Sequence, residues 1–209
     1  MLLEAFLPQC AAADIGIKGG LAWSKFAMAG NSLYYFVNHI APAAGVYFNL
    51  SLGSMTLQPE IFYIRMRTGR EGGIWTETRA SFAGLEPEPC IAWPEERLDY
   101  LQIPVLLRVN IIAGPISPFA FAGPYTSLLL AAKGLTEVAS GPIVEDLKAA
   151  YKPLDYGFVL GGGLALRAAA VKLSVEVRYI VGLANVAKDQ GPGFSLMNRS
   201  ILLLAGIGL

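Results

Sequence analysis

The sequence has few charged residues and no long apolar run. Charged residues make up 15% of the 209 residues and hydrophobic residues 54%, whereas about a quarter of a typical soluble domain is charged. A membrane-spanning helix needs about 18 consecutive apolar residues. The nearest candidate, residues 158–171, is interrupted by three glycines and Arg167. Because only helices and closed barrels satisfy every backbone polar group in lipid, we expect a transmembrane β-barrel, with an apolar soluble barrel as the alternative.

Other absences exclude several classes of function. The formal net charge is zero and no basic stripe is present, so we expect no nucleic-acid partner. The two cysteines, Cys10 and Cys90, have no metal-ligand spacing, and we expect them to be unpaired, with a disulfide as the alternative. No HExxH, CxxC or EF-hand pattern occurs. We therefore expect no metal and no cofactor.

Two further features are weak candidates for chemistry. The one histidine, His39, lies beside Asn38 in a predicted loop. Ser32, the nearby candidate nucleophile, is also in this loop and not at strand spacing, so we interpret His39 as a surface or rim residue. The run Gly161–Gly163 is not followed by the GK[ST] of a phosphate loop. We expect these glycines to ease bending and to make room for bulky neighbours, and we expect no enzyme activity.

Alternation with period two indicates strands with one apolar and one polar face. In residues 171–181, valine, leucine and tyrosine alternate with Lys172, Ser174, Glu176 and Arg178, so a strand places all four polar residues on one face. Transmembrane strands alternate in this way over about ten residues. With lower contrast, the same pattern predicts seven more strands, at 15–26, 43–52, 55–66, 98–111, 118–132, 154–167 and 196–209.

The connections between these segments alternate in length. Three are tight, at residues 52–54, 113–117 and 168–170, and four are longer, at 27–40, 67–97, 133–153 and 183–195. Within 133–153, residues 144–151 could form one or two helical turns. Outer-membrane barrels have short periplasmic turns and long extracellular loops. The pattern thus predicts an all-β, eight-stranded antiparallel up-and-down transmembrane β-barrel in the outer membrane, with periplasmic termini.

Strand parity places six charged residues in the lumen. An eight-stranded barrel is just wide enough for its side chains to fill it, and buried charges must be paired. We therefore expect a salt-bridge network that plugs the barrel, with both glutamates in reach of a cation; the alternative is a narrow basic pore. The predicted lumen charges are Lys18, Glu60, Arg108, Lys172, Glu176 and Arg178.

The outer face carries two further predictions. Arg65 and Arg67 have lipid-facing parity where the strand should leave the membrane. They either contact lipopolysaccharide phosphates, which suit guanidinium groups, or are ordinary solvated rim charges. Four tyrosines fit the aromatic girdles found at membrane interfaces. They are Tyr63, Tyr100, Tyr156 and Tyr179.

The first residues suggest a processed segment. Residues 1–9 are short and apolar, and Cys10 is followed by three alanines, which is typical of a cleavage site before Asp14. We interpret residues 1–13 as the remnant of a signal peptide, with a disordered N-terminus or a lipoprotein cysteine as alternatives. Residues 14–209 then form a single barrel domain.

An ordered series of segments resembles the outer membrane protein β-barrel domain family, the PorT-like and small OmpX-like barrels of Gram-negative bacteria. The matching pieces are residues 15–21, 57–60, 98–108, 122–125 and 155–158. Two departures stand out, because such barrels often end in Phe where this chain has Leu209, and Gln102 stands where Glu is common. The resemblance implies outer-membrane lipid, lipopolysaccharide and the outer-membrane assembly machinery as partners.

These observations favour an integral outer-membrane protein without catalysis. A structural, adhesive or assembly role is the first hypothesis, and a porin-like channel for small solutes is the second. A soluble lipocalin-like barrel that binds an apolar ligand is the third. The fold does not decide among such roles, because function depends on sites carried by the fold.

Overall fold

The computed structural model describes residues 13–29, 35–71, 95–112, 114–138, 141–168, 171–188 and 195–209. Within these ranges the chain forms nine strands and one 3-10 helix, and none of the described helices is long and apolar enough to cross a membrane. The elements are β1 (Ala13–Ala29), β2 (Tyr35–Leu52), β3 (Met55–Glu71), β4 (Glu95–Asn110), β5 (Ile116–Val138), β6 (Gly141–Asp146), η2 (Lys148–Ala150), β7 (Leu154–Ala168), β8 (Val171–Gly182) and β9 (Ser195–Gly208).

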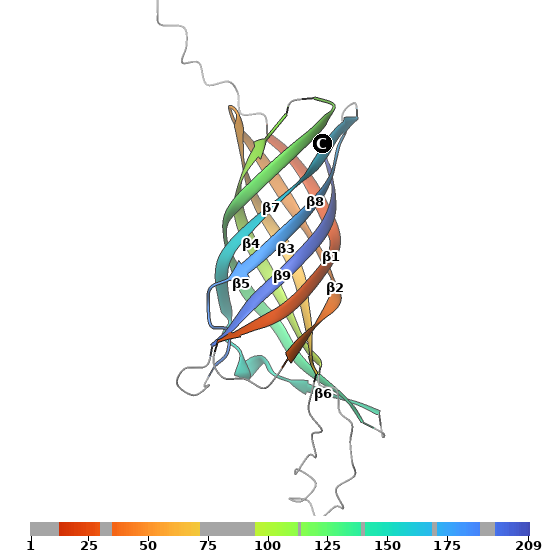
Figure 1. Ribbon diagram of the computed structural model, residues 1–209, viewed down its shortest axis with the longest axis vertical. Helices are drawn as coiled ribbons and strands as arrows, with labels where there is room; N and C mark the ends of the chain where they lie inside the picture. Colours follow the sequence, from red (N-terminus) through yellow and green to blue (C-terminus); the bar gives the residue numbers. More distant parts are fainter. Residues whose placement is uncertain are drawn as a thin grey trace, which may run out of the picture.

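Eight of the described strands close into an antiparallel barrel (Figure 1). Neighbours in sequence pair with one another, β5 pairs with β7, and β1 pairs with β9 to complete the ring. The short strand β6 lies outside the ring, where it forms a hairpin with the end of β5 that runs past the barrel. The predicted eight-stranded antiparallel barrel is confirmed.

Side chains alternate between lumen and outer face as the parity predicted. In β8, Ser174, Glu176 and Arg178 are buried, whereas Val175 and Val177 are more than half exposed. Exposed leucine, isoleucine, valine and phenylalanine side chains form an apolar band on the outer wall. Examples are Ile17, Leu21, Phe48, Ile61, Ile103, Leu128, Phe158, Leu164, Leu173, Val177, Ile201 and Leu203. An outward apolar band with an inward polar layer is the pattern of transmembrane barrels.

The two ends of the barrel differ. The ends of β2, β4 and β7 and the starts of β3, β5 and β8, which follow them after two to five residues, lie at the same end as the start of β1 and the end of β9, at the top of Figure 1. At the opposite end β5 continues into the β6 hairpin, followed by η2. Here these two ends are called the short-turn end and the long-loop end.

The strands are longer at the long-loop end than the sequence pattern predicted. β2 begins at Tyr35 instead of residue 43, β3 continues to Glu71, and β4 begins at Glu95. The alternation of apolar and polar residues is lost there, because it is needed only where one face of the strand meets lipid. The hydrogen bonds between paired strands do not need it and continue past the apolar band. A register shift between His39 and Ala43, next to Pro42, also breaks the period. Consequently His39 lies in β2, where a loop was expected.

Two other expectations were wrong in part. Of the predicted helical turns at 144–151, only Lys148–Ala150 is helical, because residues up to Asp146 pair with β5 as β6. Tyr100 is fully buried instead of joining an outer girdle, since it shares parity with the inward Gln102. Residues 1–12, with the predicted signal remnant and Cys10, and Cys90 lie outside the described residues.

Candidate functional site

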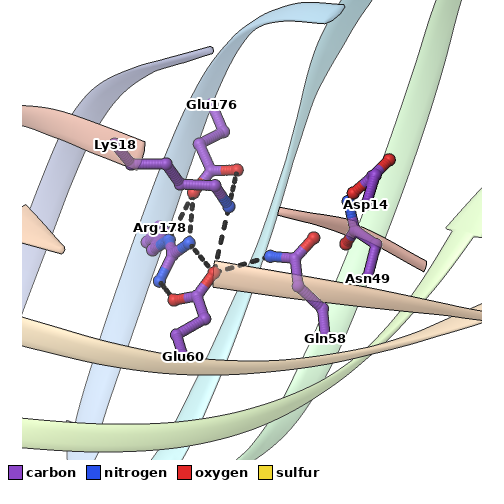
Figure 2. A network of polar contacts seen from close by, with 7 residues as sticks. All are labelled: Asp14, Lys18, Asn49, Gln58, Glu60, Glu176 and Arg178. Atoms are coloured by element: carbon purple, nitrogen blue, oxygen red, sulfur yellow. Dashed lines mark hydrogen bonds and ion pairs between the residues drawn. The ribbon is translucent and has the colours of Figure 1, made fainter. Parts of the chain in front are cut away.

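Four inward charges form a closed ion-pair network in the barrel lumen (Figure 2). The Lys18 ammonium lies 3.0 Å from Glu60 Oε1 and 2.9 Å from Glu176 Oε2. The Arg178 guanidinium donates to both oxygens of Glu60, at 2.5 and 2.8 Å, and its Nε donates to Glu176 at 2.5 Å. The side chains are no more than 1% exposed. Two cations and two carboxylates therefore neutralise each other away from water.

Barrel closure brings these four residues together from three strands. Lys18 is on β1, Glu60 on β3, and Glu176 and Arg178 are successive inward positions of β8. β3 and β8 are not neighbours in the sheet, so their side chains meet across the lumen. Gln58 donates to Glu60 Oε1 at 2.6 Å. Because each carboxylate accepts several charge-assisted hydrogen bonds, the network meets the condition under which buried charges are tolerated.

Glycines of β7 make room for aromatic rings beside the inward arginines. Gly161 pairs with Phe121 of β5 and with Arg178 of β8. A Cβ at Gly161 would lie 2.6 Å from Phe121 Cζ, and the guanidinium carbon of Arg178 is 5.3 Å from the centre of that ring. The predicted role of the glycine run, to leave space for bulky neighbours, is confirmed at this position.

The same arrangement repeats one step towards the short-turn end. Gly163 pairs with Phe119, and a Cβ there would lie 2.8 Å from Phe119 Cζ. The guanidinium carbon of Arg108 is 3.5 Å from the centre of the Phe119 ring. Because each glycine lacks a Cβ, a phenylalanine ring can lie over it and contact a buried arginine. The resulting cation–π contact offsets part of the free-energy cost of burying the charge.

The other two predicted lumen charges do not join the network. Arg108 is 3% exposed, and its Nε and Nη2 have no hydrogen-bond partner among the described residues. Lys172 Nζ lies 3.4 Å from Asp14 Oδ2, and Asp14 also accepts a hydrogen bond from Asn49 (Figure 2). These groups lie nearer the short-turn end.

A polar cluster that sequence reasoning missed fills the lumen on the long-loop side of the charges. Asp155 accepts hydrogen bonds from Tyr125 at 3.0 Å and from Asn198 at 2.8 Å. Ser200 donates to Ser24 at 2.8 Å. The period of two places these residues in the lumen. They lie, however, in strands whose two faces are both rich in apolar residues, so the sequence does not show which face points inward.

Described residues outside the barrel strands pack across the long-loop end of the lumen. Tyr151, next to η2, stacks on Phe26 with ring centres 6.2 Å apart and donates to Glu96 at 2.5 Å. It also forms a bridge with Ala187. Val186 is fully buried, and its carbonyl accepts from the backbone of Lys152. These contacts form a cap over the lumen.

The predicted lipid-contact arginines are engaged in ion pairs on the outer face. Arg65 Nε and Nη2 donate to both oxygens of Asp99, at 2.7 and 3.2 Å. Arg67 donates in the same two-pronged way to Glu95, at 2.6 Å for each bond. This hydrogen bond lowers the pKa of Glu95, which begins β4 beyond the apolar band. Contact of either arginine with lipopolysaccharide stays a prediction.

The described residues offer no evident site for metal chemistry. Among them, no group of three or more histidine, cysteine, aspartate or glutamate side chains could hold a metal ion. His39 is half-buried in β2, opposite Arg67. The described lumen side chains are suited to filling the barrel interior and to stabilising the closed barrel.

Comparisons with known proteins point to one family. A family model described as "Outer membrane protein beta-barrel domain" matches residues 9–188, and no curated protein matches the chain. Several solved structures are also similar to the chain. Neisserial surface protein A has a TM-score of 0.47 and 12% identity, with 93% of this chain and 96% of that chain covered.

Two further solved structures are similar to the chain. The N-terminal barrel domain of Pseudomonas aeruginosa OprF has a TM-score of 0.39 and 8% identity, with 93% and 95% covered. The outer membrane protease OmpT from Escherichia coli has a TM-score of 0.43 and 9% identity, with 94% and 95% covered.

Proposed function

Because the chain belongs to the outer membrane protein β-barrel domain family, we propose that it is a plugged, non-catalytic barrel with a structural, adhesive or assembly role. The observation that carries the proposal is the buried network of Lys18, Glu60, Glu176 and Arg178 across the lumen. A transport role would need a continuous water path, and these side chains occupy the middle of that path. The cap around Tyr151 supports the same conclusion at the long-loop end.

The proposed orientation places the long-loop end outside the cell and the termini in the periplasm. It is supported by the short connections that gather at one end, since outer-membrane barrels keep short turns on the periplasmic side. The β6 hairpin would then project outwards, which favours adhesion or assembly as the role. During biogenesis the partner would be the outer-membrane assembly machinery.

Planar bilayers test whether the lumen is plugged. We expect the purified protein to produce no reproducible single-channel steps in concentrated KCl, because the ion-pair network and the cap obstruct the lumen. A large porin purified in the same detergent serves as the positive control, since barrels of about 16–18 strands enclose an aqueous channel. Steps of constant size that disappear after heat denaturation of the protein would favour the narrow-pore alternative and contradict the proposal.

Lipopolysaccharide is the proposed lipid partner of the outer wall near the long-loop end. Besides Arg65 and Arg67, this region holds the cross-strand pair Lys25 and Arg199. Among the described residues neither of these two has a carboxylate partner, and together with Trp23 they line a hollow of about 210 Å³. Phosphate groups bind lysine and arginine, and tryptophan is enriched at this depth of the membrane.

Paired variants compare the two candidate lipid contacts. We expect Lys25→Ala plus Arg199→Ala to weaken lipopolysaccharide binding more than Arg65→Ala plus Arg67→Ala. The reason is that Arg65 and Arg67 are already neutralised by Asp99 and Glu95. Binding is measured with the barrel in nanodiscs. If neither double variant changes lipopolysaccharide affinity, the wall has no such site.

A further inference from the structure

A basic pocket opens at the short-turn end of the barrel, on the far side of the ion-pair network from the cap. Its volume is about 170 Å³. Asn110 and Arg167 are exposed at its mouth, whereas Arg108 is buried in it. The polar lining residues are Arg108, Asn110, Ser117, Arg167 and Lys172, none of them acidic.

The pocket lies where β4 and β7 end and where β5 and β8 begin. Asn110 ends β4 and Arg167 lies next to the end of β7. β5 pairs with both strands, so the end of β4 and the end of β7 lie close to each other. Lys172 at the start of β8 adds a third cation. Closure of the barrel thus concentrates positive charge in a concave, partly dry site, where it attracts anions more strongly than on an open surface.

Arg108 leaves one edge of its guanidinium group free. Arg65 and Arg67 each use Nε and Nη2 to bind both oxygens of a carboxylate. In Arg108 the same two N–H groups have no partner among the described residues. The face of the group lies over the Phe119 ring. Nε and Nη2 are unpartnered and almost fully covered, so a small shift of the side chain towards the pocket would let this edge donate two parallel hydrogen bonds to an oxyanion.

No nearby acidic side chain of the described part is available to fill this edge. Asp14 is held by Asn49 and Lys172. Glu176 is held by Lys18 and Arg178. A buried charge without a partner is costly, and a bound anion would remove that cost.

We propose that this pocket binds a small oxyanion of the phosphate class, with two oxygens on Nε and Nη2 of Arg108 and with Lys172 and Arg167 adding charge. The proposal goes beyond the structural role given above and does not depend on it. Binding of an anion within the short-turn mouth is compatible with a plugged or an open lumen, so the bilayer experiment and the binding experiment can fail separately.

The test is titration of the purified full chain with inorganic phosphate, in nonionic detergent and a buffer without other small oxyanions. Calorimetry gives the affinity, and the NMR signal of the Arg108 Nε–H reports on the site itself. We expect saturable binding and a shift of that signal. Because hydrogen bonds to charged groups are strong, Arg108→Gln should weaken binding about tenfold or more, a loss of about 1.4 kcal/mol or more.

Two further variants keep the result interpretable. Arg167→Gln changes an exposed residue at the mouth, so it should fold normally and weaken binding a few-fold. Lys133→Gln removes an exposed charge at the long-loop end and should leave binding unchanged. No saturable phosphate binding by the unmodified chain would overturn the proposal, and so would equal affinities of the Arg108, Arg167 and Lys133 variants. Equal binding of chloride would overturn the preference for an oxyanion.

Discussion

Replacing Arg178 by methionine is expected to lower the free energy of unfolding by about 3–5 kcal/mol, the usual cost of removing one partner from a buried ion pair. Arg178 donates to both Glu60 and Glu176. Without it, two carboxylates share only the ammonium of Lys18, and the interior carries an uncompensated negative charge. Since typical domains are stable by about 5–15 kcal/mol, the loss is a large share of the total.

Urea-induced unfolding in detergent micelles, followed by tryptophan fluorescence, measures this change. The shift of the folded band on unboiled SDS gels provides a second readout. Arg167→Met is the matched control, because Arg167 is exposed and has no ion pair among the described residues. Its effect should stay within about 0.5 kcal/mol, as for ordinary surface substitutions.

A double variant separates the charge imbalance from lost packing. Arg178→Met with Glu60→Gln restores neutrality, leaving Lys18 opposite Glu176. Because the two positions are in direct contact, their effects should not add, and the double variant should be more stable than Arg178→Met alone. An Arg178→Met protein as stable as the Arg167→Met control would show that the network contributes nothing to stability.

Adding a single methyl group at Gly161 is the second change with a large expected effect. The new Cβ would contact Phe121 Cζ at 2.6 Å and would also meet the carbonyl oxygen of Val177. The ring cannot withdraw freely because it lies between Gly161 and Arg178. We expect Gly161→Ala to cost about 1–3 kcal/mol, as overpacking of a filled core does.

Gly19→Ala is the matched control for this substitution. Gly19 is also in a barrel strand, but the nearest atom to a Cβ there is 3.8 Å away, an ordinary contact. Alanine should be neutral there or stabilise by up to about 1 kcal/mol, because glycine in a strand loses more conformational entropy on folding. Both variants are measured by the same urea unfolding. Equal stabilities of the two variants would contradict the role assigned to Gly161.

The sequence predicts the direction of side chains better than their partners. The parity of β8 alone places Glu176 and Arg178 inside, because strand geometry is strictly two-fold. Strand parity does not determine which of the six lumen charges form ion pairs with one another. The pairing of these charges depends on the stagger between strands as the barrel closes, and that stagger brings Lys18 to Glu60 and Glu176 but leaves Arg108 apart.

The alternation of apolar and polar residues did not predict the parts of the structure outside the apolar band. β2 and β3 extend beyond the predicted segments at the long-loop end. Burial still alternates along β3, where Met66 and Thr68 are buried, but the outward positions there are Arg65 and Arg67, so the sequence loses its contrast between an apolar and a polar face. The cap depends on Tyr151 and Val186, whose burial results from contacts across the barrel mouth and not from any local repeat. Tyr100 had the right parity for the lumen, but its residue type favoured the membrane interface in the prediction.

The pairing of β1 with β9 also determines how the chain must fold. Gly16 pairs with Gly208, so this pairing joins residues that are far apart in the sequence. Contacts this distant in sequence form late and slowly, and until they form both strands expose unpaired backbone edges that invite aggregation. Survival of the newly made chain therefore depends on shielding these two edges until the ring has closed.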